Sequence, residues 1–281
     1  MSPALILLAL IAAEPGAGHA RNPIYAGLIG GAPAVEGSDA TLPPPRFPDG
    51  LDAGAERAAL RDLIGSDRGV DEFLRDSIAA PHILKVRDAK AEGATVRLAD
   101  LWFAVRADLD AIDPTAAAIE SAGKPTEAGN MRFETSFVPA APPVADATRQ
   151  EWHSRVHGRL LGRIAVEATD HVVATRSADS WIIAARTDRA FDRNPDAPNR
   201  WSTLAGATPG PAQPFAGSAS YAKITRLRSA PGVLLVECHF AFVEPTAWFD
   251  GNPILRSKIG LVAQDQVRRL RRELADRKAK P

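Results

Sequence analysis

Glu237 and His239 are the first residues of this chain whose types and spacing could do chemistry. They lie two residues apart, on the same face of one predicted strand. A Glu–His pair can transfer protons if it lines a cleft. The same spacing also arises on an exposed sheet face, where polar side chains only keep the sheet soluble. Glu237 and His239 are therefore the catalytic candidates, although the pattern more strongly indicates an ordinary solvated face.

His153 and His157 are four residues apart, beside Glu151 and Trp152. On a helix this spacing would let two imidazoles share one metal ion. On a strand they would lie about 13 Å apart, whereas zinc–nitrogen bonds are about 2 Å long. Because polar and apolar side chains alternate here, we expect a strand and no metal site. The two histidines remain candidates for ligand binding.

The loop that begins at Asp192 matches the first three acidic positions of a calcium-binding EF-hand loop. The match then fails, because Ala197 occupies the glycine position and Thr203 the glutamate position. The sequence also lacks a phosphate-binding loop, a dinucleotide fingerprint, a nucleophile elbow and a C-x-x-C pair. We therefore expect no bound cofactor.

Two further groups of residues have competing interpretations. Cys238, the only cysteine, lies within an apolar stripe, which predicts a high thiol pKa and an unreactive side chain. Trp248 and Phe249 lie in a loop before the last helix. They are binding candidates because such loops can rim a ligand pocket, and the alternative is that they close the end of the core.

The N-terminal segment indicates where the protein is located. An apolar run over Ala4–Ala13 is followed by Pro15-Gly16, and small residues suit a signal peptidase cut after Ala20. The run is too short to span a membrane. We expect residues 1–20 to be a cleaved signal peptide and the protein to be exported, to a periplasm or outside the cell. The alternative is a buried N-terminal helix.

Residues 21–50 are rich in Pro and Gly and predict an extended linker. A single α+β domain is expected over 51–281, with an internal boundary or a long loop at 138–148. The chain has 34 basic and 34 acidic side chains, so no global field favours nucleic acid. The basic end of the last helix complements that helix's own dipole.

Periodicity predicts short helices near the N-terminus, a set of strands and one long amphipathic C-terminal helix. This order indicates an α+β fold on a curved antiparallel sheet. The expected helices are 52–64, 66–78, 115–121 and 254–278, and the expected strands are 83–88, 95–109, 131–137, 152–166, 171–177, 180–187, 221–228 and 233–243.

The order of elements over 150–280 resembles, in outline, that of helix-grip domains. These domains wrap a curved antiparallel sheet around a long helix and often hold apolar ligands. The resemblance rests on element order and identifies no residue. We expect non-enzymatic binding of a small apolar ligand or an envelope partner. The alternatives are a hydrolase-like enzyme around Glu237 and His239, with His153 or His157 nearby, and a surface-interaction protein without a pocket.

Overall fold

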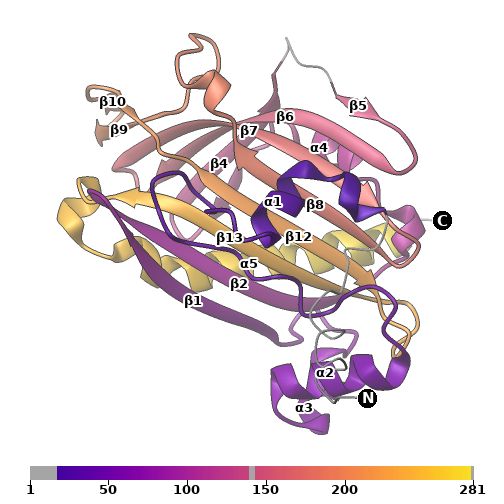
Figure 1. Cartoon of the computed structure of the whole chain (residues 1–281). Coiled ribbons are helices and arrows are strands. Elements are labelled where there is room, and N and C mark those ends of the chain that lie inside the picture. The colour runs from indigo at the N-terminus through magenta and orange to yellow at the C-terminus, as the bar shows by residue number, and fades with distance from the viewer. Residues whose placement is uncertain (1–17, 139–142, 280–281) are drawn as a thin grey trace, which may run out of the picture.

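The computed structural model describes residues 18–138 and 143–279, so most of the expected signal peptide lies outside the described residues. The chain forms a strongly curled antiparallel sheet, a half-barrel, with helices on both of its sides (Figure 1). The predicted α+β class is confirmed. No helix in the described ranges is both long and apolar enough to cross a membrane.

The sheet has a long continuous path of antiparallel neighbours and a few short additions. In spatial order the path is β1 (His82–Ala91), β2 (Ala94–Arg106), β13 (Val233–Pro245), β12 (Ser218–Arg226), β8 (Ser180–Thr187), β7 (Ile164–Arg176), β6 (Arg149–Leu160), β4 (Met131–Phe137) and β3 (Thr126–Ala128). The additions are β5 (Val144–Ala145), β9 (Arg200–Ala205), β10 (Thr208–Pro209) and β11 (Gln213–Pro214). Strands β4 and β6, which flank residues 138–148, pair with each other.

The predicted single strand over 152–166 is wrong, because β6 ends at Leu160 and β7 begins at Ile164. Leu161 and Gly162 make the turn with φ values of 52° and 67°. Leu160 pairs with Ile164, and paired residues lie on the same face. The alternation of apolar and polar side chains therefore continues unbroken through the turn, which conceals the turn in the sequence.

Two short helices begin after the N-cap residues that the sequence predicts, and the first of them also ends at its predicted C-cap. Helix α2 (Ala53–Ile64) has Asp52 as its N-cap and Gly65 in the left-handed region as its C-cap. Helix α3 (Asp67–Phe73) is capped by Ser66 and ends before the predicted limit at Ile78. The other helical elements are η2 (His19–Arg21), α1 (Pro23–Ile29), η3 (Leu109–Ala111), α4 (Pro114–Ser121), η4 (Arg189–Phe191), η5 (Trp248–Gly251) and α5 (Ile254–Ala279).

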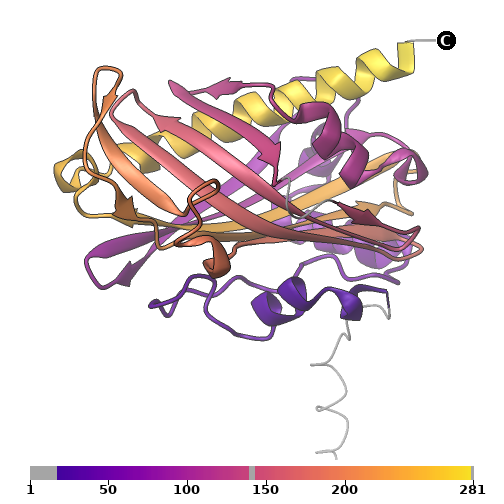
Figure 2. The ribbon, with the colours of Figure 1, turned by 90° about the horizontal axis from the view of Figure 1, so that it is seen from above.

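Helix α5 connects the two edges of the curled sheet. It packs against β1 and β2 at one edge and against β3 at the other. Figure 2 shows the helix running across the hollow side of the half-barrel. We call this side of the sheet the inner face and the opposite side the outer face.

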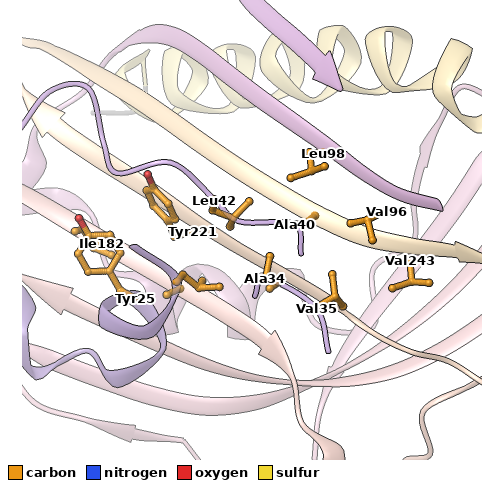
Figure 3. Packing of buried hydrophobic residues seen from close by; sticks show 14 residues of the cluster. Tyr25, Ala34, Val35, Ala40, Leu42, Val96, Leu98, Ile182, Tyr221 and Val243 are labelled. Atoms are coloured by element: carbon orange, nitrogen blue, oxygen red, sulfur yellow. The ribbon is translucent and has the colours of Figure 1, made fainter. Parts of the chain in front are cut away.

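Residues 18–50 lie along the outer face, and we call this segment the strap (Figures 1 and 2). Its apolar side chains, such as Tyr25, Leu28 and Leu42, pack against sheet residues that include Ile182 and Tyr221 (Figure 3). The structure thus differs from the expected extended linker over 21–50. Pro and Gly keep most of the strap irregular, but buried apolar side chains hold it on the sheet.

Candidate ligand-binding site

Glu237 and His239 meet on the outer face, but they are buried there. His239 Nε2 lies 3.1 Å from Glu237 Oε1, and His239 Nδ1 lies 2.7 Å from Asp100 Oδ1. Burial alone would lower the pKa of His239, but its hydrogen bonds to Asp100 and Glu237 outweigh burial and raise that pKa. Burial alone would raise the pKa of Asp100, and its interactions with His239 outweigh this and lower it.

The strap and Trp102 of β2 use the remaining hydrogen-bonding capacity of Glu237. The backbone N–H groups of Arg46 and Phe47 donate to its carboxylate, and Trp102 Nε1 donates at 2.9 Å. Glu237 and His239 are each 1% exposed. Their described partners include no second histidine. The prediction that Glu237 and His239 lie on a solvated face is therefore wrong. Because the carboxylate oxygens of Glu237 accept hydrogen bonds from the chain itself and do not face solvent, the geometry indicates that this pair anchors the strap.

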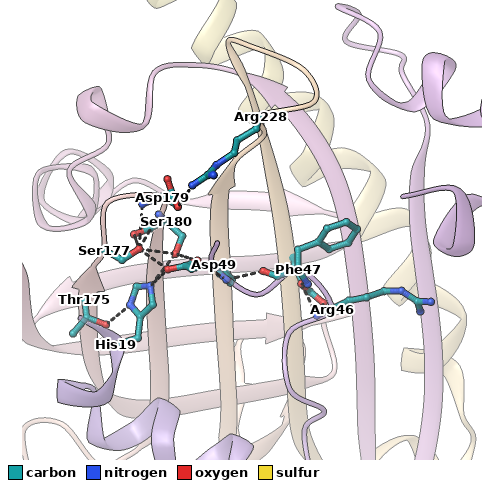
Figure 4. A network of polar contacts seen from close by, with 11 residues as sticks. His19, Arg46, Phe47, Asp49, Thr175, Ser177, Asp179, Ser180 and Arg228 are labelled. Carbon is teal, nitrogen blue, oxygen red and sulfur yellow. Dashed lines mark hydrogen bonds and ion pairs between the residues drawn. The ribbon is translucent and has the colours of Figure 1, made fainter. Parts of the chain in front are cut away.

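A second buried polar network holds the strap near its two ends (Figure 4). Lys223 Nζ lies 2.7 Å from Asp49 Oδ1 and donates to the carbonyl of Phe47 at 2.6 Å. His19 Nε2 lies 2.8 Å from Ser180 Oγ and 3.4 Å from Asp49 Oδ2. Burial alone would raise the pKa of Asp49, but the hydrogen bond with His19 and the charge of Lys223 hold it far below its usual range.

The structure places His153 with His171, and not with His157. The His153 and His171 rings stack at 4.8 Å, His153 contacts Asp188 at 3.1 Å, and His171 contacts Glu151 at 2.6 Å. No described group of three or more His, Cys, Asp or Glu side chains could hold a metal ion. The sequence did not indicate the part played by His171, because the register of β6 and β7 brings it opposite His153.

His157 lies four residues further along β6, opposite Glu167. Burial lowers its pKa, and the charge of Arg155 adds to that effect. His153 and His157 both come from the odd-numbered side of β6, whereas the even-numbered Trp152 and Leu160 pack on the inner face. Neither histidine therefore faces the hollow of the half-barrel.

Trp248 and Phe249 are core residues in the structure. They are 1% and 4% exposed, and the Trp248 ring packs on Trp201 and Phe215. Cys238 points to the inner face, and burial raises its thiol pKa to about 12. These three residues match the interpretation as the closed end of the core and an unreactive thiol.

Two hydrophobic clusters fill the ends of the inner face. One joins Trp152, Val172 and Trp181 to Val267 of α5. The other joins Ile164 and Trp248 to Leu255 near the start of α5. Both clusters thus contain side chains of the sheet and of the helix.

Between the two clusters the inner face keeps contact with solvent. On β13, Phe242 packs with one cluster and Cys238 with the other, while Phe240 between them belongs to neither and is 40% exposed. On β12 the inner residues Ser220 and Ala222 are half-buried, whereas the outer residue Tyr221 between them is buried. Water therefore reaches the middle of the inner face.

A row of polar side chains crosses this middle region on four neighbouring strands. We call Ser154, Asp170, Thr187 and Ser218 the polar stripe. Ser154 pairs with Asp170, and Asp170 pairs with Thr187. The backbone N–H of Ser218 donates to Thr187 Oγ1 at 2.9 Å, and Thr187 Oγ1 donates to Asp170 Oδ1 at 2.9 Å.

The polar stripe lies in apolar surroundings. Phe137 pairs with Ser154 at one end, and Phe242 pairs with Ser218 at the other. Within the described residues, the Thr187 hydroxyl is the sole hydrogen-bond partner of the Asp170 carboxyl. Burial raises the pKa of Asp170 to about 6. An isolated carboxyl with a shifted pKa on a concave face is typical of a functional site.

The stripe was not predicted from the sequence, although β7 contains a signal for it. The inner residues of β7 are apolar on both sides of Asp170, with Val166 and Ala168 before it and Val172 and Ala174 after it. One carboxyl in an otherwise apolar period-two series marks a position with a special role. Thr187 and Ser218 could be added only once the strand register was known.

No protein-family model matches the sequence, and no curated protein matches it significantly.

Proposed function

We propose that the protein binds a small apolar ligand on the inner face of the half-barrel, between the sheet and α5. The observation that carries this proposal is the solvent-accessible region between the two hydrophobic clusters, with Phe240 40% exposed on a strand whose other inner side chains are packed. Exposed aromatic surface in a concave region is a common feature of ligand sites.

The position of α5 supports the same proposal. Because the helix packs against β1, β2 and β3, it spans the opening between the sheet edges. A ligand in front of Phe240 would lie between the helix and the opposite wall formed by β12 and β8. It would lose most of its contact with water, which favours binding of an apolar molecule by about 25 cal/mol per Å² buried.

The buried outer networks favour binding over a hydrolytic function. The Asp100, His239 and Glu237 side chains are covered by the strap, and the acceptors of Glu237 are filled by donors of the chain itself. A hydrolytic site needs a base that can reach substrate. The inner face, in contrast, offers accessible surface without displacing any described segment.

We also propose that the protein is exported, on the support of the apolar run over Ala4–Ala13 and the small residues before Arg21. A cut after Ala20 would remove His19, which is 1% exposed and contacts Asp49 and Ser180. N-terminal sequencing of protein taken from the cell envelope tests the cut. An intact Met1 would contradict it.

Binding can be tested with N-phenyl-1-naphthylamine, an uncharged apolar dye that fluoresces when it leaves water. We expect saturable binding to the wild-type protein. Ala222→Trp, which places a large ring on the inner face, should reduce the affinity at least tenfold, and Phe240→Ser should also weaken binding. Ala58→Trp on the exposed side of α2 is the matched control and should bind as the wild type does.

Circular dichroism and thermal unfolding will show whether each variant is folded. Equal binding by folded Ala222→Trp, Phe240→Ser and wild-type proteins would contradict the proposed location. The absence of saturable binding by the wild type to this dye and to apolar compounds of other shapes would contradict the proposed function.

A further inference from the structure

We propose that the polar stripe of Ser154, Asp170, Thr187 and Ser218 recognises the protonated amine head of an amphiphilic ligand whose apolar part lies against Phe240 and Phe242. This inference rests on the proposed function and specifies the chemical class of the ligand. It follows from the charge, the hydrogen-bonding groups and the surroundings of the stripe.

The charge of the stripe favours a cation. Asp170 is its only ionisable residue, and no ion pair to Asp170 is found in the described part of the chain. The inner-face Arg97 is already paired with Glu244 and with Asp88, the latter at 2.8 Å. Arg176, whose guanidinium lies over the Trp181 ring, is paired with Asp110. An anionic head would thus meet a carboxylate, and these arginines are not free to receive it.

The hydrogen-bonding groups of the stripe also suit an ammonium group, which has three donors and no acceptor. Asp170 offers carboxylate oxygens, of which Oδ1 already accepts from Thr187. The hydroxyls of Ser154 and Ser220 have no described partner, and Ser220 lies one row from the stripe, opposite Phe240. Hydroxyl oxygens can accept from the remaining ammonium donors.

The surroundings of the stripe explain why an amphiphile is needed. Phe137 and Phe242 lie at its ends, and the next row contains Val172, Ala185 and Phe240. Burial raises the pKa of Asp170 to about 6, which shows that ionising this carboxyl in the absence of a cation is unfavourable. A cation with an apolar tail would offset that cost and cover the exposed aromatic surface.

The experiment compares three ligands at pH 8 that share one tail and differ in head group. Dodecylamine and dodecanoate are kept below their micellar concentrations, and dodecanol is kept below its solubility limit. Binding to the wild-type protein is measured by isothermal titration calorimetry. We expect dodecylamine to bind at least tenfold more tightly than dodecanol, and dodecanoate to bind most weakly.

Asp170→Asn keeps the acceptor for Thr187 and removes the charge, so it should abolish the preference for the amine and leave dodecanol binding nearly unchanged. Asp196→Asn, in an exposed loop, is the matched control and should keep the wild-type preference. Equal affinity for the three ligands, or an amine preference that persists in a folded Asp170→Asn variant, would overturn the inference while leaving the proposed function intact. Failure of all three ligands to bind would count against both.

Discussion

Replacing Asp170 by Asn should stabilise the protein at neutral and alkaline pH and have little effect in acid. Burial raises the pKa of this carboxyl from 3.8 to about 6, so the folded protein binds the proton more tightly than the unfolded chain. The stability contributed by Asp170 therefore falls as the pH rises from about 4 to 6 and stays low above that window. A rise of about two pH units in the pKa corresponds to a loss of about 3 kcal/mol in the free energy of unfolding once the carboxyl is ionised. Since Asp170 is only half-buried and water reaches it, we expect a gain of about 2 kcal/mol for the amide at pH 8.

The gain can be measured by urea denaturation of the wild type and Asp170→Asn at pH 8 and pH 4. Each unfolding free energy is compared within one pH, so that other titrating groups cancel. The exposed Asp196→Asn variant should show no difference at either pH. If Asp170→Asn is less stable than the wild type at pH 8, or if its gain is equal at both pH values, Asp170 is not an ionised carboxyl held in an apolar wall.

Three further predictions concern the strap. Lys223→Met removes the cation beside Asp49 and should lower the free energy of unfolding by about 3 kcal/mol in urea denaturation, and a change below 0.5 kcal/mol would contradict the buried ion pair. A chain that begins at Arg21 lacks the His19 contacts with Ser180 and Asp49, so it should be about 1–3 kcal/mol less stable than a chain that begins at Gly18. Equal melting curves for the two chains would mean that these contacts contribute nothing to stability. Because the pKa of His239 is raised above 6.5, its stabilising effect is complete at lower pH and is lost as the pH rises through the raised value. The difference in unfolding free energy between the wild type and His239→Gln should therefore shrink toward alkaline pH. A difference that stays constant with pH would contradict this.

The sheet could be predicted because period-two alternation is a local property of the sequence. It identified the strands that became β4, β8, β12 and β13, and the last helix, from neighbouring residues alone. The turn at Leu161-Gly162 was missed because paired residues on either side of a short loop have the same parity. The strap was missed because Pro and Gly content describes the backbone, whereas burial of Tyr25 and Leu28 depends on a distant sheet.

The candidate site was less predictable because its contacts join distant parts of the sequence. Glu237 and His239 were recognised as a pair, but their burial depends on Asp100 in β2 and on the strap. Asp170 could be seen in the sequence as one acid in an apolar series. Its place in a polar stripe could not be predicted, because that depends on the strand register that brings Thr187 beside it. Charge, residue type and spacing could not show which face the strap covers.

The most direct test of ligand binding on the inner face is a titration of isotopically labelled protein with dodecylamine, followed by amide chemical shifts. The account predicts that the largest shifts occur at Asp170, Ser218, Ser220 and Phe240, with little change at Arg46 and Phe47 under the outer network. Shifts confined to the strap, or spread evenly over the surface, would contradict it.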